Sequence, residues 1–136
     1  MMTSMRRGGI KLVLVVEDSP TQAIHMQSLL EKVGLRCMLA SNGQTGLYLA
    51  QTLLPDLVIM DLEMPQMNGY QVAEALKADA QTAQIPIIMM TRHDSADDVV
   101  KGMEAGAMEY IPKDAFADAV LLETLRQMKV IAQASQ

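Results

Sequence analysis

The sequence predicts an α/β domain in which helices cover both faces of a five-stranded parallel sheet. Five short apolar runs alternate with longer amphipathic stretches along the chain. Strict alternation of strand and helix is typical of parallel sheets, because parallel neighbours need a crossover connection. Three runs are nearly unbroken, as expected for strands that are covered on both faces. The runs are Ile10–Val16, Arg36–Ala40, Asp56–Met60, Pro86–Met90 and Met108–Ile111.

Residues that start or stop helices lie between these runs. Ser and Asn side chains cap free backbone N–H groups, Pro suits the first helical position, and Gly or Pro follows a helix end. The first helix is therefore expected to start at Ser19-Pro20 and to end at Gly34. The other signals are Asn42-Gly43 before a helix over residues 44–53, Pro55 after it, Ser95 with Asp98 as a capping box, and Gly106 at that helix's end.

The last helix is expected over about residues 115–131. Its apolar residues at i, i+4 and i+7 form one stripe toward the core, and they are Leu121, Leu125 and Met128. Three more apolar residues fall outside this stripe: Val120, Leu122 and Ile131. They leave open a homodimer or partner surface, since surface helices also carry such residues without any partner.

The expected topology is a flavodoxin-like (βα)5 fold. The run at residues 36–40 is the most polar of the five, which suits a strand at the sheet edge. By analogy with flavodoxin-type sheets, the strand order is expected to be 2-1-3-4-5. Such sheets bind ligands at the carboxyl ends of their strands, so the residues that follow each strand are the candidates for function.

Composition and charge exclude several classes of protein. The 136 residues are 50% hydrophobic, which is too apolar for a disordered chain and fits one domain. The formal charge of −5 argues against a direct nucleic-acid partner, which would need a basic surface. The apolar runs are far shorter than the ~20 residues of a membrane span, and no signal peptide is visible. The single cysteine, Cys37, fits a reducing compartment, so a cytoplasmic location is expected.

The sequence predicts one domain over residues 10–131. Residues 1–9 show no pattern of a helix or strand and are expected to be a disordered leader. Residues 132–136 follow the last helix as a tail. Neither an internal repeat nor a long linker divides the chain.

Polar residues follow four of the five predicted strands. They are Glu17 and Asp18 after the first strand, Asp61 after the third, Thr91 after the fourth, and Lys113 just beyond the fifth. A single acid after a strand is most often a helix cap or a solvated loop residue. Because the carboxyl ends of parallel strands meet at one edge of the sheet, these residues are instead expected to form one site.

The charges at these strand ends predict a divalent cation. Three carboxylates and the Lys113 ammonium leave a net charge of −2, and the carboxylates repel one another unless a cation lies among them. Oxygen ligands without His or Cys favour Mg²⁺. The site could then receive a phosphoryl group, with Asp61 as the nucleophile and Lys113 and Thr91 contacting the transferred oxygens.

These motifs resemble those of the response-regulator receiver domain of two-component signalling. The resemblance covers about residues 10–130. The run Asp61-Leu62-Glu63-Met64-Pro65-Gln66-Met67-Asn68-Gly69, together with the later Thr91 and Lys113, is the most specific part. The acidic stretch Val15–Asp18 and the segment Glu104–Lys113 also match.

The resemblance implies a phosphoacceptor site that works with Mg²⁺. Asp61 would accept a phosphoryl group from a phosphohistidine on a sensor histidine kinase or phosphotransfer protein. Asp18 would bind Mg²⁺ directly, Glu17 mostly through water, and the Glu63 backbone carbonyl would supply a further ligand. Such a domain is a signalling module, and it catalyses only its own phosphorylation and dephosphorylation.

The resemblance also implies a switch that transmits phosphorylation to a downstream effector. Thr91 would follow the phosphoryl group by hydrogen bond, and Tyr110 would change rotamer with it. The coupled shift would alter the surface made by the fourth helix, the fifth strand and the fifth helix.

Two residues depart from the family pattern. Asp114 follows Lys113, where the family usually has proline in a cis peptide bond. Either the loop is trans here or Asp114 caps the last helix, and both leave Lys113 usable. Arg92 follows Thr91, where a small residue is usual, so it either narrows access to the site or adds a phosphate contact.

Three further residues are candidates for modulating roles. Glu63 and His93 lie two residues beyond Asp61 and Thr91, at positions that in this family tune the lifetime of the phosphorylated state. Glu63 is expected to disfavour the added phosphoryl charge and to orient the hydrolytic water. His93 is either a solvated loop residue or a kinetic one. His25, on the first helix, is expected to face the kinase.

Other functions fit the residues less well. A metal-dependent phosphatase with an aspartate nucleophile would place that aspartate after the first strand, and it would need a cap to hold its substrate. A small flavodoxin-like cofactor-binding module would need a glycine-rich phosphate loop, which the sequence lacks. A degenerate receiver, which signals by protein contact without phosphorylation, would not need the full set of polar residues.

Overall fold

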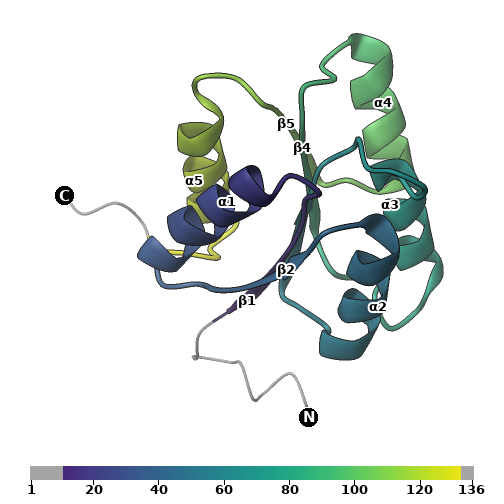
Figure 1. Cartoon of the computed structure of the whole chain (residues 1–136), viewed down its shortest axis with the longest axis horizontal. Helices are drawn as coiled ribbons and strands as arrows, with labels where there is room; N and C mark the ends of the chain where they lie inside the picture. Colours follow the sequence, from purple (N-terminus) through teal and green to yellow (C-terminus); the bar gives the residue numbers. More distant parts are fainter. Residues whose placement is uncertain (1–10, 133–136) are drawn as a thin grey trace.

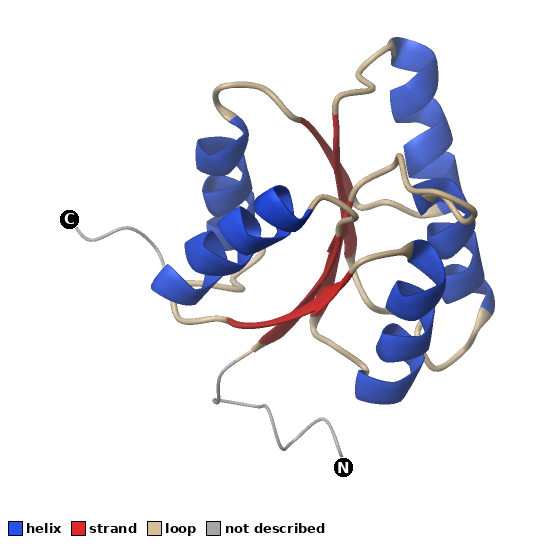
Figure 2. Ribbon diagram, in the orientation of Figure 1, coloured by secondary structure: helices blue, strands red, loops and turns tan. Residues whose placement is uncertain are grey.

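The computed structural model describes residues 11–132 and contains one parallel sheet of five strands. The predicted leader, residues 1–9, and residues 133–136 of the predicted tail lie outside the described residues. The observed order β2-β1-β3-β4-β5 confirms the expected one. Figure 2 shows the strands as a single twisted layer between helices. The strands are β1 (Leu12–Val16), β2 (Arg36–Ala40), β3 (Leu57–Met60), β4 (Ile87–Thr91) and β5 (Glu109–Pro112).

Five helices cover the two faces of this sheet. Helices α1 and α5 lie on one face, and α2, α3 and α4 lie on the other (Figure 1). Strands β1, β3 and β4 are buried along their whole length, as their nearly unbroken apolar runs predict. None of the helices in the described part of the chain is long and apolar enough to span a bilayer. The helices are α1 (Pro20–Lys32), α2 (Gly43–Leu53), α3 (Gly69–Ala78), α4 (Ala96–Ala105) and α5 (Ala117–Gln127).

The alternation of side chains along each strand divides the apolar core in two. Leu14 and Met60 contribute to the core under α2, α3 and α4. Val13 and Ile59, one position earlier on the same strands, contribute to the core under α1 and α5. Strand β2 lies at the sheet edge, where its first four residues alternate between exposed and half-buried and only Ala40 is buried, and this position accounts for its more polar sequence.

The predicted helix caps form. In the three helices with a predicted cap, α1, α2 and α4, the side chain of the residue before the first turn accepts a hydrogen bond from a backbone N–H in that turn, which satisfies a group without a partner inside the helix. The pairs are Ser19 with the N–H of Gln22, Asn42 with that of Thr45, and Ser95 with that of Asp98.

The last helix is shorter than the predicted range of residues 115–131. Before it, the Asp114 carboxylate accepts a hydrogen bond from the Phe116 N–H at 2.8 Å, and this turn delays the helix start to Ala117. Beyond its end, Lys129 has a φ of 64°, a left-handed conformation that an α-helix cannot contain. The helix therefore occupies only the middle of the predicted range.

The predicted extra apolar surface on α5 is largely wrong. Leu122 and Ile131 are partly buried against the core beneath α1 and α5, because the helix and the turn after it lie close to the sheet. Val120 is 45% exposed, as predicted, and Phe116 one turn earlier is 71% exposed. The exposed apolar surface near α5 therefore centres on these two residues.

Truncating the buried stripe of α5 should destabilise the fold, whereas truncating its exposed side should not. Leu121 is fully buried, so Leu121→Ala should lower the free energy of unfolding by about 2–5 kcal/mol through lost burial and the cavity left behind. The adjacent Val120→Ala is the control and should change it by less than about 0.5 kcal/mol. Urea unfolding followed by circular dichroism measures both, and equal losses would contradict the observed packing of α5.

Candidate functional site

Glu17 and Asp18 lie at the carboxyl end of β1, where the chain turns into α1. The Glu17 N–H donates to the Ala40 carbonyl at 2.9 Å, which extends the β1–β2 pairing by one residue. The Glu17 side chain is buried, and its Oε2 accepts a hydrogen bond from the Ser19 N–H at 3.2 Å. The turn thus fixes the carboxylate while leaving Oε1 for a further partner.

Asp61 follows β3 at the centre of the sheet. Its N–H donates to the Val16 carbonyl at 3.1 Å, so the backbone of Asp61 also continues the sheet. Its Oδ1 accepts a hydrogen bond from the Glu63 N–H at 3.2 Å. Its Oδ2 accepts one from Lys113 at 3.0 Å. The carboxylate is therefore held on both oxygens.

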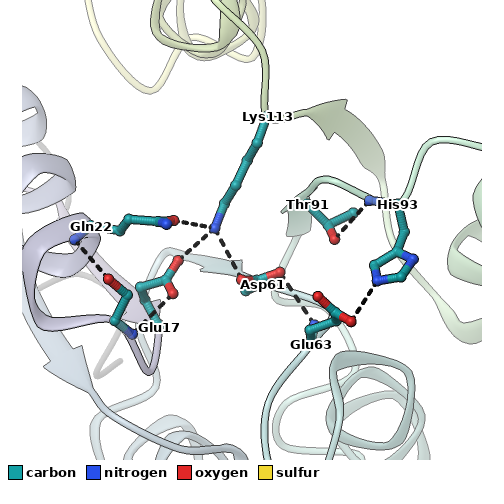
Figure 3. Close-up of polar contacts among 8 residues, drawn as sticks. Glu17, Gln22, Asp61, Glu63, Thr91, His93 and Lys113 are labelled. Atoms are coloured by element: carbon teal, nitrogen blue, oxygen red, sulfur yellow. Dashed lines mark hydrogen bonds and ion pairs between the residues drawn. The ribbon is translucent and has the colours of Figure 1, made fainter.

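Lys113 reaches this carboxylate from the far edge of the sheet. It follows β5, and its N–H donates to the Thr91 carbonyl at 2.8 Å. Its Nζ donates to Glu17 Oε1 at 2.8 Å, to Asp61 Oδ2 at 3.0 Å and to Gln22 Oε1 at 2.5 Å (Figure 3). All three partners are oxygens that accept hydrogen bonds, so each of the three N–H groups of the ammonium has an acceptor.

The acidic residues fit a hard divalent cation. Glu17, Asp18 and Asp61 each offer a carboxylate oxygen, and these atoms lie within 4.8 Å of one another. Asp18 is exposed and Asp61 is half-buried, so the group is open to solvent on one side. A set of carboxylates with room for water is the ligand type that Mg²⁺ prefers.

A cavity of about 220 Å³ lies over these groups, which leaves space beside Asp61. Arg92 is exposed and lines the same cavity as Lys113. The lining residues are Glu17, Asp18, Ser19, Gln22, Asp61, Glu63, Arg92 and Lys113.

Thr91 and Tyr110 both contact the backbone of His93. The buried Thr91 hydroxyl accepts a hydrogen bond from the His93 N–H at 3.3 Å. The Tyr110 hydroxyl donates to the His93 carbonyl at 2.5 Å, and burial is the main cause that raises the pKa of Tyr110 above its usual value. The Tyr110 ring lies against Gly102 of α4, where a Cβ would come within 2.7 Å of the ring. One residue of the loop after β4 therefore joins both side chains.

The side chains of His93 and Glu63 meet at the rim of the site. His93 Nε2 lies 2.7 Å from Glu63 Oε2, and His93 Nδ1 lies 3.9 Å from Asp98 Oδ2. The hydrogen bond with Glu63 is the largest cause that raises the pKa of His93, although partial desolvation opposes it. His93 is thus partly exposed at the rim and in contact with Glu63.

Two other predicted residues lie beside this site. Among residues 11–132 every peptide bond is trans, so the loop at Asp114 takes the first of the two expected forms. Asp114 is not the N-cap of α5, since that position is Phe116 and has no side-chain cap. His25 is exposed on α1, and its Nε2 lies 2.7 Å from Asp118 Oδ2 on α5, so it joins two helices.

The sequence-based reasoning missed Gln22. It lies in the first turn of α1, which begins directly after the acidic pair. A polar residue in the first turn after a site-forming strand end was the available signal. Glutamine is common on helix surfaces, however, so the sequence gives no sign of its contact with Lys113.

Comparison with known proteins agrees with this geometry. The family model described as the response regulator receiver domain matches residues 13–126. The chain belongs to this family. It is 39% identical to protein PilH of Pseudomonas aeruginosa over 109 residues, which cover 80% of this chain and 90% of PilH. It is 32% identical to the DNA-binding dual master transcriptional regulator RpaA of Synechocystis over 127 residues, which cover 91% of this chain but only 53% of RpaA.

Solved receiver structures share the fold. The chemotaxis response regulator CheY4 of Vibrio cholerae superposes with a TM-score of 0.80 at 30% identity, over 90% of this chain and 99% of that one. The receiver domain of a sensor histidine kinase from Pseudomonas aeruginosa gives a TM-score of 0.79 at 26% identity, over 88% of this chain and 97% of that one. That structure has a magnesium ion coordinated in its active site cleft.

The contact between His93 and Glu63 should be visible as a raised histidine pKa. In the metal-free protein the imidazole of His93 should titrate above 6.5, and in Glu63→Gln its pKa should move toward 6.5. Because the contact favours the protonated ring, its stabilisation is complete below pH 6.5 and is lost as the pH rises through the raised pKa. An NMR titration measures this, with His93→Ala to assign the resonance. Identical titration curves in the two proteins would rule out the contact.

Proposed function

We propose that this chain is a phosphoacceptor switch of a two-component phosphorelay, with Asp61 as the phosphoacceptor. The observation that carries the proposal is the position of the Asp61 carboxylate. It lies within 4.8 Å of the Glu17 and Asp18 carboxylates and contacts the Lys113 ammonium at 3.0 Å, beside an open cavity. Membership of the receiver family supports the same function.

In the proposed reaction an Asp61 oxygen attacks the phosphorus of a phosphohistidine on a sensor histidine kinase or a phosphotransfer protein. An O–P bond forms, the P–N bond breaks, and its electron pair stays on the imidazole nitrogen. Lys113 neutralises charge on the transferred oxygens, and its bond to Asp61 Oδ2 orients the carboxylate before the reaction. The switch returns to its starting state by hydrolysis, in which water attacks the phosphorus of the aspartyl phosphate, the bond to the Asp61 oxygen breaks, and inorganic phosphate leaves.

The proposed cofactor is Mg²⁺. Asp18 and Asp61 would bind it directly, Glu17 mostly through water, and the backbone carbonyl of Glu63 would complete the protein ligands. When bound, the cation supplies neutralisation of the carboxylates and of the phosphoryl charge. The oxygen donors and the solvent access of the cluster support this assignment.

The proposed switch works through the loop after β4. The Thr91 hydroxyl contacts the His93 N–H, and the Tyr110 hydroxyl contacts the His93 carbonyl. If Thr91 turns to a phosphoryl oxygen, its bond to His93 is lost, and the loop and Tyr110 rearrange together. The surface of α4, β5 and α5 then changes shape for a downstream effector, a partner or a second copy of this chain.

The remaining predicted residues are proposed to modulate this cycle. Glu63 adds negative charge at the rim and orients the hydrolytic water, while His93 offsets that charge through its contact at 2.7 Å. Arg92 lines the cavity and is proposed to contact the phosphoryl donor. His25 lies on the α1–α5 face, which is the proposed kinase-facing surface.

We also propose that the protein acts in the cytoplasm and makes no direct contact with nucleic acid or membrane. The receiver domain is proposed to span residues 10–131, and its catalysis to be limited to its own phosphorylation and dephosphorylation. A degenerate receiver remains the competing proposal, and a metal-dependent phosphatase ranks below it. The chain spans about half the length of RpaA.

Intact mass tests the phosphoacceptor directly. The protein mixed with Mg²⁺ and acetyl phosphate should gain one phosphoryl group, while Asp61→Asn should gain none. Omitting Mg²⁺ should also abolish the adduct, because the uncompensated carboxylates repel an anionic donor. Absence of the adduct from a folded parent protein, checked by circular dichroism, would refute the proposal and favour the degenerate receiver.

Removing the Glu63 carboxylate should change the lifetime of the phosphorylated state. Glu63→Ala should alter the first-order rate of phosphate loss severalfold, because the carboxylate lines the cavity beside the acceptor and contacts His93 at the rim. Decay of the phosphorylated mass after donor removal measures this rate. Glu123→Ala, an exposed change on α5, is the control, and the role assigned to Glu63 fails if all three rates agree.

A further inference from the structure

Lys113 has three ammonium hydrogens, and each has an oxygen acceptor in the protein. Two acceptors are the anions Glu17 and Asp61, at 2.8 and 3.0 Å. The third is the neutral amide oxygen of Gln22, at 2.5 Å, the shortest of the three. The Lys113 side chain is only 18% exposed, so this amide takes a position that water would otherwise fill.

The first turn of α1 sets the position of Gln22. Ser19 caps the helix through the Gln22 N–H at 3.3 Å, and Pro20 occupies the first helical position. The Ser19 N–H also donates to Glu17 Oε2. One capped turn therefore orients two of the three acceptors around Lys113, and both lie on the same side of the ammonium, opposite Asp61 (Figure 3).

We propose that Gln22 is a positioning residue, which holds the Lys113 ammonium so that its remaining N–H points at the group on Asp61. The inference rests on the proposed function of Asp61. Gln22 and Glu17 can keep their two bonds while the third hydrogen moves from the Asp61 carboxylate to a phosphoryl oxygen. The ammonium is then oriented before the reaction.

The neutrality of the amide matters for this role. The cluster of Glu17, Asp18, Asp61 and Lys113 already carries a net charge of −2, and a fourth carboxylate would add repulsion against an anionic donor. An amide oxygen accepts the hydrogen bond without adding charge. Gln22 therefore gives Lys113 a fixed third contact at no electrostatic cost to phosphoryl transfer.

Gln22→Met tests the proposal, because methionine has a similar length and no amide. The Gln22→Met protein should gain a phosphoryl group from acetyl phosphate and Mg²⁺ about tenfold more slowly than the parent protein. This is the order expected for a lost hydrogen bond to a charged group. Gln27→Met is the matched control on the same helix. Gln27 is half-buried, and its side chain donates a hydrogen bond to Glu31 on the same helix, away from Lys113, so that rate should stay unchanged.

A double-mutant cycle separates positioning from a general structural effect. In a Lys113→Met background, Gln22→Met should cause no further loss of rate, because its effect passes through the ammonium. A separate readout is hydrogen exchange of the Lys113 ammonium, followed through its NMR signal at low temperature. In the parent protein and in Gln27→Met, exchange should be slow enough for the signal to be observed. In Gln22→Met the signal should be lost.

Three results would overturn the inference: parent-like rates in Gln22→Met, an equal tenfold loss in the Lys113→Met background, or an unchanged ammonium signal. These outcomes differ from failure of the proposed function itself. If the parent protein gains no phosphoryl group, the phosphoacceptor proposal fails, while the NMR comparison still reports whether Gln22 orients Lys113.

Discussion

The interaction of Lys113 with Glu17 and Asp61 joins three strand ends that do not all adjoin in the sheet. Strand β4 separates β5 from β3, and β3 and β4 separate β5 from β1, so the long side chain of Lys113 passes one strand end to reach Asp61 and two to reach Glu17. Buried carboxylates are costly unless they are paired, and the side chain of Glu17 is only 8% exposed. The ammonium thus permits the acids to lie together, and the remaining negative charge is what suits the site to a divalent cation.

The sheet gives this group of charges its precision. Glu17, Asp61 and Lys113 each lie just past a strand, and each backbone N–H donates to a neighbouring strand as if the strand continued. The side chains therefore extend from the end of a sheet that is packed by apolar cores on both faces. Phosphoryl transfer depends mainly on position and charge, so a rigid platform is the part of the fold that the chemistry needs.

The loop after β4 is where the site meets the outer surface. The backbone of His93 contacts Thr91 inside the site and Tyr110 toward α4, while its side chain contacts Glu63 across the rim. These contacts connect the rim of the site with Tyr110, whose ring lies against α4. The same loop carries Arg92, one of the two residues that depart from the family pattern, and Arg92 lines the cavity over Asp61.

The sequence by itself determined the fold class, the strand order by analogy, the helix caps and the five polar residues at the strand ends, because apolar periodicity and capping are local properties of the chain. Only the tertiary structure decided the limits of α5, where the turn at Asp114 and the positive φ of Lys129 override helical periodicity. It also decided that Leu122 packs inward, that His93 meets Glu63 and that Gln22 completes the shell of Lys113. Such contacts join residues up to 91 positions apart, and their distances depend on side-chain orientations that no local pattern encodes.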